Sequence, residues 1–399
     1  MDVAQATAAS AKLWRSAEAF APVFGERTVA ATTARRLSSE TVAQMRDAGM
    51  LKAYVPLAFG GDELQMVDVL PAVARLARGC SAAAWVLAVY QIHNWLVALL
   101  DNAVQQEVFA DGPSPVIVAS LNPMKNIARV VDGGFLIERG SFPFCSGAPA
   151  REWAWLGVQV LDANDAVVDV GALLVRGGEL QEKDDWFVSG LQATGSLSLT
   201  CTDLFVPQDR LLSYASACAG SSPGLGTNST PMFNAAFVPM LVLNLGGPGL
   251  GIAEQALQDF TATLLSKPGA YPITGEARAQ APQAHILLAE AEMQIDIARL
   301  LLNRAGRVIG DTAALPGRMP RSLAAKTCVD TTWATRECMH AVHALFLNSG
   351  GAVLTPKHSL QRAFQDVSAI NCHGFLSHES AVRLYGSLVA GQTEPTAFI

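Results

Sequence analysis

Charged residues are scarce in this chain, and several motifs that would assign it to a class are absent. Asp, Glu, Lys and Arg make up 16% of its 399 residues, whereas apolar residues make up 50%. This composition excludes an intrinsically disordered chain and predicts a large buried core, with apolar surface left for contacts between subunits. The net charge of −7 and the scattered Lys and Arg argue against a nucleic-acid partner.

Motifs for metals, disulfides and phosphates are also missing. The seven cysteines are widely spaced and form no Cys-x-x-Cys pair, so neither a disulfide framework nor a structural zinc site is expected. Glu337 and His340 have the spacing of a di-iron ligand pair, but the second copy that such a site needs is absent. The sequence contains no G-x-G-x-x-G and no Walker A motif. We therefore expect no metal site and no phosphate-binding loop.

One uncharged stretch, residues 80–100, has about the length that crosses a bilayer. It contains Gln91, His93 and Asn94, each of which is costly in lipid. We interpret it as a buried core helix and expect no membrane partner. The first residues lack the basic stretch and apolar core of a signal peptide, so a cytoplasmic protein is expected.

The pattern along the chain changes twice. Apolar residues recur at helical spacing in the first part, short β-rich segments follow from about residue 113, and helical spacing returns in the last part. This order predicts an α+β protein, with an N-terminal helical domain at 1–112, an antiparallel β-barrel at 113–212 and a C-terminal helical bundle at 225–399. The small-residue segment 217–230 is expected to be a mobile loop, either a lid or a linker.

Three motifs occur in an informative order. They are GSFPFCSG at 140–147, GLQATGS at 190–196 and QRAFQD at 361–366, with His373 seven residues further on. Together with the helix–barrel–helix order, they resemble the acyl-CoA dehydrogenase fold over essentially the whole chain. The resemblance implies that the C-terminal part is a four-helix bundle and that a flavin lies between the barrel and this bundle.

The resemblance has one decisive departure. Acyl-CoA dehydrogenases often carry their catalytic base in a Glu-Gly-Thr motif after the bundle helix, whereas this chain has His373 there. That histidine resembles a branch of the fold, the oxygenase components of two-component flavin monooxygenases, which act on 4-hydroxyphenylacetate, phenolic steroids, dibenzothiophene or indole. The branch implies reduced FAD or FMN supplied by a separate flavin reductase, molecular oxygen as co-substrate, and a homotetramer or homodimer.

The resemblance also implies a reaction and a set of site residues. The reaction is hydroxylation of an apolar, phenol- or indole-like aromatic through a C4a-hydroperoxyflavin. The implied catalytic residues are His93, His373, Ser120 and Ser146. The implied flavin contacts are Ser146, Gly147, Thr194, Gly195, Ser196 and, for the phosphate, Arg278. Residues expected to meet the substrate are Asn122, Tyr90 and Phe237.

These residue types suit oxygen transfer. A flavin hydroperoxide survives only in a dry site that holds its proton, and a serine hydroxyl or a near-neutral histidine can supply hydrogen bonds without a fixed charge. Three alternatives stay open at this point. They are an acyl-CoA dehydrogenase with a relocated base, a nitrogen-oxidising enzyme of the nitrososynthase type, and a non-catalytic binding protein with the same fold.

Overall fold

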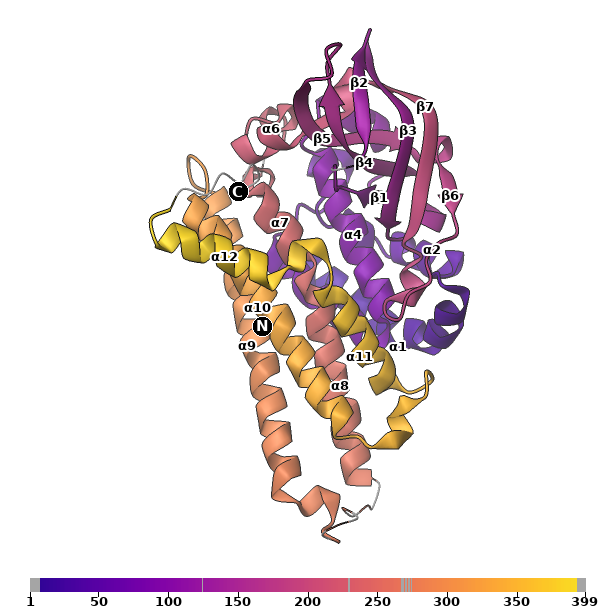
Figure 1. Cartoon of the computed structure of the whole chain (residues 1–399), viewed down its shortest axis with the longest axis vertical. Coiled ribbons are helices and arrows are strands. Elements are labelled where there is room, and N and C mark those ends of the chain that lie inside the picture. Colours follow the sequence, from indigo (N-terminus) through magenta and orange to yellow (C-terminus); the bar gives the residue numbers. More distant parts are fainter. Residues whose placement is uncertain are drawn as a thin grey trace.

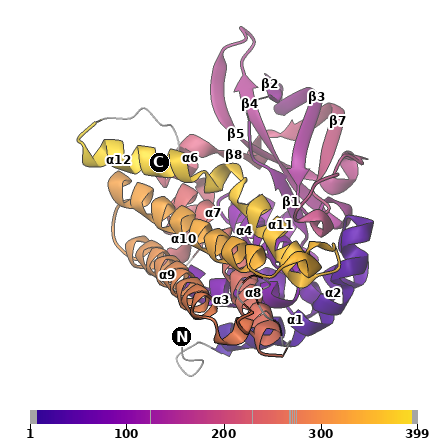
Figure 2. The same cartoon turned by 60° about the horizontal axis from the view of Figure 1, so that its bottom comes forward.

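The computed structural model describes residues 8–392 except 124, 229, 267, 268, 270, 272 and 274. Helices come first along the chain, a β-sheet follows, and helices return. In Figures 1 and 2 the sheet lies at one end of the molecule, and helices from both helical parts meet beneath it.

Helix α4 (Ser81–Val97) is the centre of the N-terminal part. It contacts α3, α8 and the first strand of the sheet, and every residue from Ala82 to Val97 is buried. A helix without a polar face needs protein on all sides, so the other helices and the sheet enclose it. The remaining helices of this part are α1 (Ala8–Ala34), α2 (Ser39–Asp47), α3 (Met66–Gly79) and α5 (Asn102–Val108).

The sheet has eight strands in the order β6-β7-β3-β2-β4-β5-β8, and β1 pairs with β4 outside this path. The strands are β1 (Ile117–Ser120), β2 (Ile127–Val131), β3 (Gly134–Cys145), β4 (Trp153–Leu161), β5 (Val167–Arg176), β6 (Gln181–Lys183), β7 (Leu197–Pro207) and β8 (Leu211–Ser213). The sheet is mixed, because β1 and β2 both run parallel to β4. It thus differs from the purely antiparallel barrel expected from the turn-rich sequence.

The parallel pairings have a simple origin. Strand β1 pairs with the first half of β4, and β2 pairs with its last residues. The segment 117–131 therefore passes once along β4 and is interrupted only by its loop. A sequence of alternating strands and turns predicts hairpins. It cannot show that two consecutive strands, β1 and β2, both pair with the same strand, β4.

In the C-terminal part, α10 (Arg321–Leu347) packs against α8, α9, α11 and α12. Their bounds are α8 (Gly246–Ser266), α9 (Pro282–Ala313), α11 (Ser359–Asn371) and α12 (His378–Val389), preceded by α6 (Tyr214–Ala219) and α7 (Phe237–Asn244). This confirms the expected helical bundle. By length and composition, the stretch Phe237–Ser266 alone among the described residues could cross a membrane, and 94% of its apolar window is buried inside the protein.

The segment 217–230 is docked in its described part, in contrast to the expected mobile loop. A Cβ at Gly224 would lie 2.1 Å from the carbonyl oxygen of Ala98, so the loop backbone packs directly on the end of α4. The Asn228 side chain donates to the same carbonyl at 2.8 Å. Small residues here allow two backbones to approach closely. Composition alone could not distinguish such a closely packed loop from a flexible one, because both are rich in small residues.

Asp366 of α11 joins the bundle, the sheet part and α4. Its carboxylate accepts the backbone N–H of Leu191 at 2.6 Å and the hydroxyl of Ser81. Burial raises the pKa of Asp366, and these two hydrogen bonds oppose the shift. One carboxylate thus fixes segments that lie 175 and 285 residues away in sequence.

We expect Asp366→Ala to lower the free energy of unfolding by about 1–3 kcal/mol, because it leaves a buried N–H and a hydroxyl without their acceptor. Glu138→Ala is the matched control, since Glu138 pairs with Arg129 on the surface and such a pair contributes less than about 1 kcal/mol. Chemical denaturation of both variants measures the difference. Equal losses would show that Asp366 does not join the three segments.

Candidate active site

Three hydroxyl groups meet where the sheet approaches α4. Ser146 follows the end of β3, Thr194 ends the short helical turn 192–194, and Ser196 precedes β7. The Ser146 and Ser196 oxygens are 2.8 Å apart, and the Ser196 and Thr194 oxygens are 2.7 Å apart. The structure therefore brings together residues that lie 50 positions apart and were predicted from two separate motifs.

A bulge directs Ser146 toward this cluster. The register of β3 against β7 shifts between Phe142 and Cys145, and Phe144 has a left-handed backbone with φ of 64°. Bulges commonly re-aim a side chain, and a left-handed non-glycine residue points to a local requirement. The Phe144 ring is 69% exposed, so an uncovered aromatic surface lies two residues before the serine.

A hydrogen bond between Tyr90 and Gly147 holds the backbone directly after Ser146. The Tyr90 hydroxyl donates to the Gly147 carbonyl at 2.9 Å. A Cβ at Gly147 would lie 2.1 Å from that hydroxyl, and its φ of 78° also favours glycine. Tyr90 is fully buried, so the structure places this expected substrate contact beneath the loop that carries Ser146.

Trp85 connects the hydroxyl cluster to His373. Its indole N–H donates to the Ser146 oxygen at 3.1 Å, and its ring lies edge-on to the His373 ring at 5.5 Å. Trp85 belongs to α4 and His373 precedes the turn 374–376 after α11, so the sheet, α4 and the C-terminal part meet here. The motifs predicted both Ser146 and His373 but missed Trp85, whose only sequence signal is its place in the uncharged helix.

His93 lies two helical turns further along α4 and is 6% exposed. Its Nδ1 is 2.8 Å from the carbonyl oxygen of Ile117 in β1. A carbonyl only accepts, so the hydrogen-bond partner assigns the proton to Nδ1 and leaves Nε2 as an acceptor. Desolvation lowers the pKa of His93 to about 4, and the bond to Ile117 offsets part of the shift.

His373 has the opposite hydrogen-bonding polarity. Its Nδ1 accepts the backbone N–H of Phe375 at 3.2 Å, so in the neutral ring the proton is on Nε2. Desolvation lowers the pKa of His373 to about 4. At neutral pH both rings are uncharged, and one presents an acceptor at Nε2 while the other presents a donor.

The predicted catalytic residue Ser120 and the predicted substrate residues Asn122 and Phe237 come from β1, the loop after it and α7. Ser120 ends β1 and is buried, and Asn122 follows in the next loop. The Tyr214 hydroxyl donates to the carbonyl of the intervening Leu121 at 2.7 Å. Phe237 packs against both Tyr214 and Trp95. The buried Trp95 indole N–H, which the sequence did not single out, has no hydrogen-bond partner among the described residues.

Arg278 is not part of this cluster. It lies in the turn before α9 and donates to the carbonyl of Asn348 at the C-terminal end of α10. Figure 1 shows this connection between α8 and α9 at the end of the bundle opposite the sheet. Arg278 therefore lies at the end of α10 and not beside Ser146.

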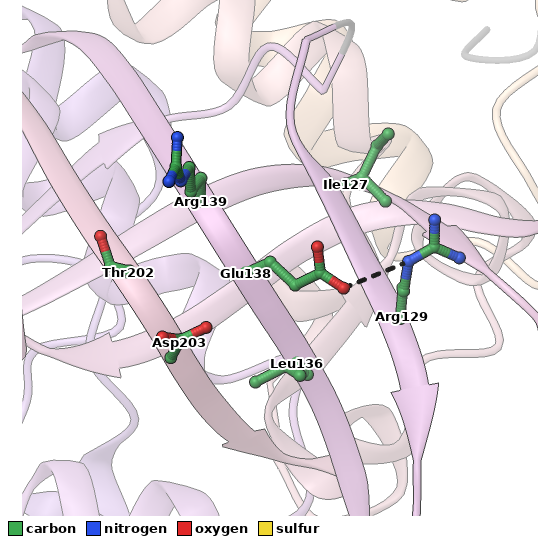
Figure 3. A pocket seen from close by; sticks show the side chains of 7 residues that line it. All are labelled: Ile127, Arg129, Leu136, Glu138, Arg139, Thr202 and Asp203. Carbon is green, nitrogen blue, oxygen red and sulfur yellow. Dashed lines mark ion pairs between the residues drawn. The ribbon is translucent and has the colours of Figure 1, made fainter.

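A surface hollow of about 380 Å³ lies on β2, β3 and β7 (Figure 3). Its walls carry the ion pair between Arg129 and Glu138. Arg139 and Leu136 are in the first half of β3, about 23 Å and about 33 Å of extended strand from Ser146. The hollow is therefore separate from the cluster that the motifs predict.

Comparison with known proteins identifies the family. The acyl-CoA dehydrogenase N-terminal domain family matches residues 8–108, and the corresponding C-terminal domain family matches residues 243–378. The chain is 32% identical over 369 residues to the flavin-dependent monooxygenase oxygenase subunit HsaA of Mycobacterium tuberculosis, with 92% of each chain covered. The chain belongs to the flavin-dependent monooxygenases of the acyl-CoA dehydrogenase fold.

Two further matches support this assignment. The crystal structure of the M. tuberculosis HsaA monooxygenase superimposes with a TM-score of 0.91 and 29% identity, covering 98% of this chain and all of the other. The p-hydroxyphenylacetate 3-hydroxylase oxygenase component of Acinetobacter baumannii is 23% identical, with 94% of this chain and 88% of the relative covered. This enzyme is therefore the oxygenase component of a two-component flavin-dependent aromatic monooxygenase.

The residues at the cluster fit a flavin ring. They provide a neutral hydroxyl group at Ser146 and, two residues earlier, the exposed ring of Phe144. When bound, the flavin supplies the oxygen-activating chemistry that amino-acid side chains lack.

The low pKa of His93 makes stability dependent on pH. The unfolded chain takes up a proton on this residue near pH 6.5, whereas the folded protein does so only near pH 4. The unfolded state thus binds more protons between these values, and stability falls as the pH drops through this window. We expect His93→Asn, which keeps a donor for Ile117, to reduce the loss of unfolding free energy between pH 7 and pH 5 by about 2 kcal/mol.

Denaturant titrations of wild type and variant at both pH values, at one protein concentration, measure this difference. His285→Asn is the matched control, because His285 is exposed. An unchanged pH dependence in His93→Asn would show that His93 is not held neutral by burial.

Proposed function

We propose that this enzyme hydroxylates a phenol- or indole-like aromatic with reduced FAD or FMN and molecular oxygen, through a C4a-hydroperoxyflavin. The observation that carries the proposal is the pairing of a neutral hydroxyl cluster with two uncharged histidines of opposite hydrogen-bonding polarity. Oxygen transfer from a flavin hydroperoxide needs directed hydrogen bonds without free water or a strong acid. These residues supply directed hydrogen bonds and include no strong acid.

Each residue has a specific role in this proposal. Ser146 holds the flavin at N5, supported by Gly147 and the Thr194–Ser196 segment. Nε2 of His93 accepts the O–H of a phenol or the N–H of an indole, because Nδ1 is committed to Ile117. Nε2–H of His373 donates to the oxygen that is transferred, because its Nδ1 is committed to Phe375. Ser120 and Asn122 orient the substrate beside Phe237.

The substrate is proposed to be a largely apolar aromatic. Trp95, Tyr214 and Phe237 form a continuous aromatic group, and the Tyr214 hydroxyl bonds to Leu121, which follows Ser120. The polar positions among them are few and uncharged, which is typical of a small-molecule pocket that fixes orientation. The test is a panel of phenols and indoles supplied with oxygen, reduced flavin and a flavin reductase, with hydroxylated product quantified per NADH consumed. Product formed from none of these aromatic compounds would contradict the proposed substrate class.

We expect Ser146→Ala to bind flavin but to release more hydrogen peroxide in place of product. The loss of about 1 kcal/mol of hydrogen bonding corresponds to an about fivefold shorter lifetime of the oxygenating species. Product and peroxide yields per NADH measure the effect. Ser141→Ala is the control, because Ser141 is exposed on β3. Unchanged coupling in Ser146→Ala would remove the proposed role.

We also propose that the enzyme is a homo-oligomer, a tetramer or a dimer. Helix α9 carries exposed apolar residues at Ile286, Met293, Ile297 and Leu300. Their spacing of seven, four and three residues places them in one stripe along the helix. Contact through the bundle would also offer Arg278 to a flavin in a neighbouring subunit.

Placing a charge in this stripe tests the oligomer. We expect Met293→Asp to shift the molecular mass measured by light scattering to a smaller species, because a buried unpaired carboxylate is unfavourable in an interface. Glu292→Gln on the same helix should leave the mass unchanged. A wild-type monomer, or an unaltered mass in Met293→Asp, would contradict this surface as the interface.

A further inference from the structure

The hydroxyl cluster beside Trp85 has only one possible arrangement of its protons. The contacts run from Ser146 to Ser196 at 2.8 Å, from Ser196 to Thr194 at 2.7 Å and from Thr194 to the carbonyl oxygen of Leu191 at 2.8 Å. Two oxygens at such distances need a proton between them. The three contacts therefore need three protons, and the three hydroxyls supply one each.

The carbonyl at the end of the series sets the direction. The Leu191 carbonyl oxygen can only accept, so the Thr194 proton points to it. Thr194 must then accept from Ser196, and Ser196 must accept from Ser146. The Ser146 proton is consequently turned inward. This changes the expectation from sequence, in which the Ser146 hydroxyl was available as a donor.

Ser146 is left with acceptor capacity alone. A hydroxyl oxygen has two lone pairs, and the Trp85 indole N–H occupies one of them at 3.1 Å. One lone pair remains for a ligand. The exposed fraction falls from 8% at Ser146 to 4% at Ser196 and 1% at Thr194, so Ser146 is the accessible end of the series.

The end at Leu191 is held in place independently. The Leu191 backbone N–H donates to Asp366 at 2.6 Å, and the Thr194 backbone N–H also donates to the Leu191 carbonyl at 3.1 Å. The acceptor that sets the direction is thus attached to the bundle as well as to its own turn. The proton order does not depend on a mobile side chain.

A flavin presents opposite groups at N5 in its two redox states. Oxidised flavin has a bare N5, which only accepts a hydrogen bond, whereas two-electron-reduced flavin carries N5–H, which donates. We propose that Thr194 and Ser196, acting through Ser146, make the site selective for reduced over oxidised flavin. The inference rests on the proposed placement of N5 at Ser146, and it assigns Thr194 and Ser196 as positioning residues that act at a distance from the ring.

The selectivity has a functional consequence for a two-component enzyme. The oxygenase must take reduced flavin from solution and release the oxidised form after each turnover. An acceptor at N5 pairs with the reduced form and faces the lone pair of the oxidised form, which leaves both groups unsatisfied. The same hydroxyl series thus favours both the binding of reduced flavin and the release of oxidised flavin after turnover.

Thr194→Val tests the proposal because it removes the hydroxyl and keeps the shape of the side chain. Without Thr194 as acceptor, Ser196 can donate to Ser146, and the Ser146 proton becomes free to bond to oxidised N5. We expect the ratio of dissociation constants, oxidised over reduced, to fall by about three- to tenfold. For a two-electron couple this lowers the midpoint potential of bound flavin by about 15–30 mV.

The probes are FMN and FAD, each titrated in the oxidised form and, after dithionite reduction, anaerobically. Ser196→Ala is the second variant and should lower the ratio in the same way, since it also frees the Ser146 proton. Thr194→Ser keeps a hydroxyl and should restore the wild-type ratio. Thr202→Val, which removes an exposed hydroxyl from β7, should leave both dissociation constants unchanged.

The outcomes separate this inference from the proposed function. Wild type that binds oxidised flavin as tightly as reduced flavin would overturn the selectivity, as would an unchanged ratio in both Thr194→Val and Ser196→Ala. Wild type that binds neither redox form of FMN or FAD would instead contradict the proposed function, and with it the inference. A folded Thr194→Val with a reduced ratio, restored in Thr194→Ser, is the result that we expect.

Discussion

Helix α4 lacks charged side chains and is buried along its length, and three of its polar side chains bond to the backbone packed around it. Gln91 donates to the Met50 carbonyl, His93 is bonded to the Ile117 carbonyl, and Asn94 donates to the Pro115 carbonyl. These bonds fix the short helical turn at residues 50–52 and the first strand of the sheet relative to the helix. The site depends on this arrangement, because Trp85 and His93 meet the sheet only if the strands keep their place against α4.

Burial also determines the chemistry available to the site. Desolvation keeps both His93 and His373 neutral at physiological pH, and a neutral imidazole always has one donor and one acceptor nitrogen. Because Ile117 and Phe375 take the Nδ1 atoms in opposite senses, the two rings are not interchangeable. A site built from neutral groups of fixed polarity can guide protons without the strong acid that would expel peroxide early.

The sequence predicted the helix–sheet–helix order, and two of its motifs named Ser146, Thr194 and Ser196, which the structure brings together. Ser146 and Gly147 were predicted from the motif at residues 140–147. His373 was predicted because it stands where acyl-CoA dehydrogenases often carry their Glu-Gly-Thr base. The parallel pairing of β1 and β2 with β4 was not predictable, since strand periodicity does not encode which strands are neighbours. The role of Trp85 was missed because an aromatic residue in an apolar helix has no distinguishing pattern. The proton order of Ser146, Ser196 and Thr194 needs interatomic distances, which no motif provides.

Oxygen transfer at this site is tested most directly by loading the protein anaerobically with chemically reduced FMN or FAD, mixing it rapidly with oxygen, and following the transient absorbance. We expect a flavin–oxygen intermediate that outlives the oxidation of the same flavin free in solution. Oxidation at the rate of free flavin, without an intermediate, would contradict the assignment of Ser146 and the two histidines to oxygen transfer.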